Sequence, residues 1–100
     1  MDSETLFWGI ADDLVVDPGV EEGTMMGQRC LRSNGSFAAM VDRRNGGLVV
    51  KLSADRVDEL VASGTGESFA PAGKIFREWV LVRRPDRTTW STLMREAVGA

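Results

Sequence analysis

The chain has 100 residues, a net charge of −3 and 43% hydrophobic residues, which fits one folded domain rather than a disordered chain. One cysteine and no histidine exclude an intramolecular disulfide, a Cys/His zinc site and a Ser-His-Asp or Cys-His catalytic arrangement. The N-terminus is acidic and no apolar run approaches the ~20 residues of a membrane span, so we expect a cytoplasmic protein with no membrane partner.

Charge is distributed unevenly along the chain. Residues 1–22 hold seven acids and no base, whereas residues 23–100 hold eight acids and all twelve bases. One explanation is that the acidic first helix packs near the basic remainder. The other is an exposed basic face that binds an anionic partner.

The first segment predicts a helix from Ser3 to Val16. Apolar residues recur there at three- and four-residue spacing, which places Leu6, Phe7, Ile10, Ala11 and Leu14 on one face. Asp2 or Ser3 can cap the first turn. Asp17-Pro18-Gly19 ends the helix, because a proline disfavours helix in the residue before it.

Residues 23–52 predict a three-stranded antiparallel meander. Asn34-Gly35 is a strong hairpin signal, since both residues tolerate the positive φ of a type I′ turn. This turn would join a strand near Thr24–Ser33 to a strand at Ser36–Arg43, and Asn45-Gly46-Gly47 would lead into Leu48–Leu52. In the second strand we expect Phe37, Ala39 and Val41 on one face, and Ala38 and Met40 on the other.

The rest of the chain predicts a helix, a strand and a final helix. Ser53 can cap a helix that ends at Gly64, since glycine is favoured just beyond a helix. Residues 65–74 are predicted as loop, Lys74–Val82 as a strand and Thr88–Val98 as the last helix. The fold class is therefore α+β in the order α-β-β-β-α-β-α, with an antiparallel sheet of about four to five strands flanked by three helices.

Six short blocks carry a family resemblance. They are Asp17-Pro18-Gly19-Val20, Thr24-Met25-Met26-Gly27, Asn34-Gly35, Leu48-Val49-Val50-Lys51-Leu52, Ala72-Gly73-Lys74 and Trp79-Val80-Leu81-Val82. In this order and spacing the chain resembles the TfoX N-terminal domain family, whose fold is related to YjbR-like domains. The resemblance covers essentially all of residues 1–100 as a single domain. The chain departs from the family pattern at Met26-Gly27-Gln28, where an aromatic residue and a glycine pair are usual, and at Arg29 and Arg32, where apolar residues are usual.

The polar residues offer few routes to catalysis. Adjacent acids such as Asp12-Asp13 or Asp58-Glu59 point about 100° apart on a helix, so a solvated face is favoured over a metal or acid–base pair. Gly73-Lys74 lacks the other residues of a phosphate loop, and Gly64-Thr65-Gly66 lacks the third glycine of a dinucleotide turn. We therefore expect no catalytic residue, metal or cofactor. An enzyme that uses carboxylates alone remains the catalytic alternative, and a structure without an acid-lined pocket would exclude it.

Two further residue types have competing interpretations. Cys30 lies beside Arg29, and a neighbouring cation can lower the pKa of a thiol and make it reactive. A plain, partly buried strand residue is the favoured interpretation. The tryptophans Trp8, Trp79 and Trp90 lie in apolar segments and are expected in the core or at its edge. An exposed tryptophan would instead be an interface anchor, because tryptophan is enriched at binding hot spots.

The arginines are the candidate anion or nucleic-acid contacts, because a planar guanidinium donates to phosphate in pairs. The candidates are Arg29, Arg32, Arg43, Arg44, Arg83, Arg84 and Arg87. Against this interpretation, the ten-to-two excess of arginine over lysine also follows from biased codon usage. Arg29 and Arg32 are also three residues apart, so they fall on opposite faces of a regular strand.

The leading functional hypothesis is a non-catalytic regulatory or protein-interaction module. This rests on the missing catalytic residues and on the resemblance, which implies a bacterial regulatory or accessory domain. We expect a protein partner or a second copy of the chain in a homodimer, with Met25, Met26 and Phe76 as candidate interface residues. The alternative is a weak nucleic-acid-binding accessory protein that uses its surface arginines, with an affinity that falls steeply with salt.

Overall fold

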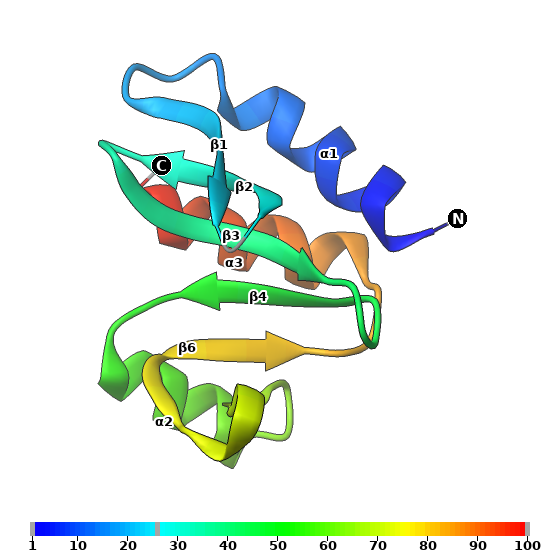
Figure 1. Cartoon of the computed structure of the whole chain (residues 1–100), viewed down its shortest axis with the longest axis vertical. Coiled ribbons are helices and arrows are strands. Elements are labelled where there is room, and N and C mark those ends of the chain that lie inside the picture. The colour runs from blue at the N-terminus through cyan, green and yellow to red at the C-terminus, as the bar shows by residue number, and fades with distance from the viewer. Residues whose placement is uncertain (1, 26, 100) are drawn as a thin grey trace.

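The computed structural model describes residues 2–25 and 27–99, and it is built from one sheet and three helices (Figure 1). Among these residues the helices are α1 (Ser3–Leu14), α2 (Ala54–Ala62) and α3 (Arg87–Val98). The strands are β1 (Val20–Met25), β2 (Gln28–Ser33), β3 (Ser36–Asp42), β4 (Gly47–Lys51), β5 (Glu67–Phe69) and β6 (Phe76–Val82). The predicted α+β class is confirmed, in the order α-β-β-β-β-α-β-β-α.

The sheet is antiparallel throughout, with the strand order β1-β2-β3-β4-β6-β5. It has six strands where four to five were expected. The segment predicted as one strand, Thr24–Ser33, is divided between β1 and β2 by a turn in which Gly27 has a φ of +74°. Residues 65–74, predicted as loop, contain β5 and a short 3-10 helix at Pro71–Gly73. The candidate residue Met26 lies outside the described residues.

The local signals at the turn and the helix ends were predicted correctly. Asn34 and Gly35 both have positive φ, at 52° and 83°, as a type I′ hairpin requires. Asp2 accepts a hydrogen bond from the Thr5 amide, and Ser53 accepts one from the Arg56 amide. Each side chain satisfies an amide that has no partner inside its helix.

The main core lies between the helices and one face of the sheet (Figure 1). Its helical members include Phe7, Leu14, Leu60 and Trp90, and Trp90 is fully buried with its indole donating to the Arg84 carbonyl at 3.0 Å. The strands contribute Val20, Leu31, Ala39, Val41, Leu48, Val50, Val80 and Val82. Burial of one such large apolar side chain stabilises the fold by about 1.5–3 kcal/mol, so this face holds most of the stability.

The opposite face of the sheet has its own apolar cluster, formed by strand residues. The members are Cys30, Phe37, Met40, Val49, Phe69 and Leu81, with Met25, Phe76 and Trp79 packed against them. The Trp79 ring stacks on Phe37 at 4.3 Å and on Phe69 at 5.6 Å, within 20° of parallel in each case, and Phe76 meets it edge-on at 5.1 Å. We call this group the aromatic cluster, and none of its members comes from a helix. The stacked and edge-on ring pairs add to the stability that burial of the rings provides.

Strand β3 changes partner half-way along its length. Its first half pairs with β2, and its pairing with β4 runs from Ala39 to Asp42. The β2 register shifts between Leu31, which faces Ala39, and Arg32, which faces Phe37. Ala38 is therefore an extra residue, and a bulge of this kind bends its strand.

The bulge corrects the predicted faces of β3. Phe37 belongs to the aromatic cluster with Met40, whereas Ala39 and Val41 belong to the main core. The prediction assumed that side chains alternate strictly between the two faces of the sheet. The extra residue Ala38 breaks this alternation, so the residues before it, Phe37 included, point to the face opposite the predicted one. Phe37 is thereby placed against Trp79.

The turn between β3 and β4 is organised by Asp42, the one charged residue that is buried among the described residues. Its carboxylate accepts the Arg44 amide at 3.0 Å, the Arg44 side chain and the Asn45 side chain. Its carbonyl accepts the Gly46 amide at 2.7 Å. Burial alone would raise the pKa of Asp42, but the hydrogen bonds and the Arg44 charge outweigh it and lower that pKa.

We predict that Asp42→Asn destabilises the protein in a pH-dependent way. Because the folded pKa is depressed, the charged carboxylate stabilises the fold above the unfolded pKa of about 3.9, and that contribution is lost as pH falls through the folded value. The unfolding free energy at pH 7 should fall by about 1–2 kcal/mol, as urea titration measures. The difference from wild type should shrink below pH 4. Asp58→Asn on the exposed side of α2 is the control, and a pH-independent difference at Asp42 would contradict the prediction.

Candidate functional site

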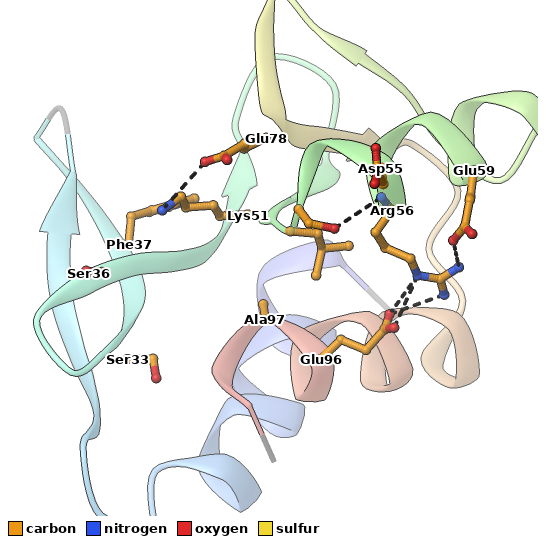
Figure 2. A pocket seen from close by; sticks show the side chains of 12 residues that line it. Ser33, Ser36, Phe37, Lys51, Asp55, Arg56, Glu59, Glu78, Glu96 and Ala97 are labelled. Atoms are coloured by element: carbon orange, nitrogen blue, oxygen red, sulfur yellow. Dashed lines mark hydrogen bonds and ion pairs between the residues drawn. The ribbon is translucent and has the colours of Figure 1, made fainter.

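A groove of about 820 Å³ opens between the tip of the β2–β3 hairpin, the start of α2 and the end of α3 (Figure 2). Its lining residues are Ser33, Ser36, Phe37, Lys51, Leu52, Ser53, Asp55, Arg56, Glu59, Glu78, Glu96 and Ala97. Figure 2 shows the hairpin on one side of the groove, α2 on the other and the end of α3 below. These elements are far apart in the sequence, so the groove is a product of the tertiary fold.

The groove lies where β3 and β4 separate. Their pairing ends at Ala39 and Val50, whereas β4 stays paired with β6 as far as Lys51, and just beyond it the Leu52 amide donates to the Glu78 carbonyl at 2.9 Å. The first half of β3 continues with β2 beyond the bulge. The resulting wedge has Phe37 on its β3 side and Leu52 on its β4 side.

One wall of the groove is held by Arg56. Its guanidinium bridges α2 and α3 by meeting Glu96 at 3.1 Å, and it also meets Glu59 at 3.2 Å (Figure 2). The Glu96 carboxylate, followed by that of Glu59, raises the pKa of Arg56. The Arg56 side chain is 36% exposed, so a ligand in the groove can reach it.

The opposite wall carries a looser ion pair. Lys51 Nζ lies 4.0 Å from Glu78, and both side chains are more than two-fifths exposed. With Asp55, four carboxylates and two cations line the groove, which leaves a net charge of −2. The groove can hold a ligand by charge and hydrogen bonds, and both of its basic groups already face carboxylates.

The carboxylate-only enzyme is not excluded by this geometry, because the groove is a concave pocket lined by several acids. Three of those acids, Glu59, Glu78 and Glu96, face a cation. Among residues 2–25 and 27–99, no group of three or more metal-ligating side chains is close enough to hold a metal ion. No helix in the described part of the chain is long and apolar enough to cross a bilayer.

Two of the predicted anion-binding arginines, both on β2, are already engaged by other residues of the chain. Arg29 meets Glu22 at 2.6 Å and lies over the Trp8 ring at 4.2 Å, so the Glu22 carboxylate raises the pKa of Arg29. Arg32 donates to the carbonyls of Thr24 and Gly35 at 2.7 and 2.9 Å. Its side chain crosses Gly23, where a Cβ atom would come within 2.6 Å of it.

The other candidate arginines occupy the far end of the sheet or the start of α3. Arg44 pairs with Asp42, and Arg83 pairs with Glu67 at 2.8 Å. The remaining three, Arg43, Arg84 and Arg87, are exposed. Four of the seven are therefore engaged with partners of the same chain, and the structure does not gather the set on one element.

The candidate interface residues Met25 and Phe76 lie together in the aromatic cluster, both half-buried. Neighbouring Ile75, which the sequence did not single out, is 61% exposed. The tryptophans fit their prediction, with Trp90 in the core and Trp8 and Trp79 at the edges of the two clusters.

The charged residues of the groove were missed by the sequence analysis. Arg56 and Glu96 are 40 residues apart on different helices, and no local pattern connects them. One local signal was Lys51, a cation at the end of the otherwise apolar strand β4. Comparison with family models, curated proteins and solved structures gave no significant match, so the TfoX resemblance remains a prediction.

We predict that Cys30 is not alkylated by iodoacetamide in the native protein at neutral pH. The thiol is fully buried, and burial raises its pKa more than the Arg32 charge lowers it. Mass spectrometry should show one added group only after unfolding in urea. Rapid native labelling would instead support the reactive-thiol interpretation.

Proposed function

We propose that the chain is a non-catalytic protein-interaction module that grips an extended, positively charged segment of a partner protein in the groove of Figure 2. The observation that carries the proposal is the opening of the sheet between β3 and β4, with an excess of carboxylates around it. The identity of the partner bound in the groove would determine what the module regulates.

The shape of the groove favours an extended segment. Strands β3 and β4 diverge at the base of the groove. The first half of β3, which precedes its first pair with β4 at Ala39, runs along the groove and pairs only with β2. An extended peptide can lie beside a strand whose ladder has ended and place alternate side chains into the groove. Phe37 and Leu52 offer apolar surface for those side chains.

The charge of the groove favours lysine or arginine in that segment. Glu96 is held by Arg56 and Glu78 is loosely paired with Lys51, and Asp55 on the first turn of α2 also lines the groove. A partner cation can share these carboxylates, and complementary charge also steers the encounter. The net negative charge of the groove would repel a polyanion such as nucleic acid.

We predict that the protein binds a fluorescein-labelled peptide of alternating lysine and valine, about nine residues long, with an affinity that decreases as salt increases. The matched peptide of alternating glutamate and valine should not bind. Fluorescence anisotropy at low salt measures both affinities. The double variant Asp55→Asn, Glu78→Gln removes two exposed charges and should weaken lysine–peptide binding roughly tenfold.

The control variant is Glu21→Gln, which changes an exposed acid on β1 outside the groove. It should bind the lysine peptide as the wild type does. Equal weakening by both variants would show only non-specific charge attraction and would contradict the proposal. A labelled single-stranded oligonucleotide tests the alternative: an anisotropy change lost in Arg84→Glu would replace the peptide proposal with nucleic-acid binding.

A further inference from the structure

We propose that a second hollow, at the other end of β3, binds a small apolar molecule that carries an anionic group. Its volume is about 340 Å³, and Met25, Met40, Phe69 and Pro71 form its apolar lining. Gln28, Asp42, Arg43 and Arg44 complete it. The two hollows have different linings, so this proposal does not depend on the peptide groove.

The hollow has the same origin as the groove. Pairing between β2 and β3 ends at Leu31 and Ala39, so the start of β2 and the end of β3 diverge. The Gln28 side-chain amide crosses this gap and donates to the Val41 carbonyl, which would otherwise face β2. This hydrogen bond links the two strands where their ladder has ended, and Gln28 then lines the hollow together with Met40 and Asp42 of β3.

The lining suits a small apolar body. Met25 and Met40 are unbranched and polarizable, so they can adapt to aromatic or aliphatic ligands, and Phe69 offers an aromatic ring. Small-molecule sites in proteins have volumes of roughly 300–1,000 Å³ and a mostly apolar lining with a few polar groups. An adjoining hollow of about 450 Å³ shares Asp42, Arg44, Phe69 and Pro71, which leaves room for a larger ligand.

The polar groups at the rim favour an anion. Asp42 is the one acid in the lining of the smaller hollow, and its oxygens already accept the Arg44 amide and the side chains of Arg44 and Asn45. Arg43 is exposed beside it and adds an unbalanced positive charge. A carboxylate or sulfonate on the ligand would therefore meet a net charge of +1, and Arg43 can donate to it in pairs.

The experiment compares 2-naphthoate with 2-naphthalenemethanol, which has the same ring system without the charge, by titration of the ¹⁵N-labelled protein. We expect saturable amide shifts for 2-naphthoate that are centred on Met25, Gln28 and Arg43, and weaker binding of the alcohol. Arg43→Glu should weaken 2-naphthoate binding roughly threefold to tenfold and leave the alcohol unchanged. Arg84→Glu, an exposed arginine outside both hollows, should change neither.

Several outcomes would overturn the proposal. These are the absence of saturable shifts, shifts centred on Lys51 and Arg56 in the groove, or equal loss of affinity in Arg43→Glu and Arg84→Glu. If the protein binds naphthoate but not the lysine peptide, only the peptide proposal is refuted. If it binds the lysine peptide but not naphthoate, only the proposal of a small-molecule site is refuted.

Discussion

The bulge at Ala38 is the constraint on which the rest of the structure depends. Because it adds one residue to β3, the register with β2 shifts between Leu31 and Arg32, and the pairing of β3 with β4 begins only at Ala39, just after the bulge. β3 pairs with β2 in its first half and with β4 in its second, so the sheet bends around it. The same extra residue turns Phe37 toward Trp79, and the aromatic stack then covers the face of the sheet opposite the helices.

A shared strand of this kind opens the sheet at two diagonally opposite corners. At one corner β3 leaves β4, and the gap is lined by Lys51, Arg56 and four carboxylates. At the other corner β2 leaves β3, and the gap is lined by methionines, Phe69 and two arginines. The first corner is acidic and suits a cationic chain, whereas the second is apolar with a basic rim.

The parts of the fold that depend on neighbouring residues could be predicted from the sequence. The Asn34-Gly35 hairpin, the Ser53 cap and the antiparallel α+β class follow from local backbone preferences and apolar periodicity. The bulge could not be predicted, because Ala38 and Ala39 are both small and apolar and neither residue type indicates an inserted position. The groove residues were missed for a related reason: the Arg56–Glu96 pair exists only once α2 and α3 are docked. The arginines were identifiable as cations, but their partners, such as the backbone carbonyls that hold Arg32, come from the fold.

The change of partner along β3 can be measured directly by cross-strand nuclear Overhauser effects between backbone protons. We expect contacts of Arg32 with Phe37 and of Leu31 with Ala39 on the β2 side, and of Ala39 with Val50 and Val41 with Leu48 on the β4 side. Contacts of Arg29 with Val41, or of Phe37 with Leu52, should be missing. A contact of Phe37 with Leu52 would mean that β3 pairs with β4 beyond the bulge and that the peptide groove does not open. A contact of Arg29 with Val41 would mean that β3 stays paired with β2 and that the second hollow does not open. Finding both would remove the basis of both binding proposals.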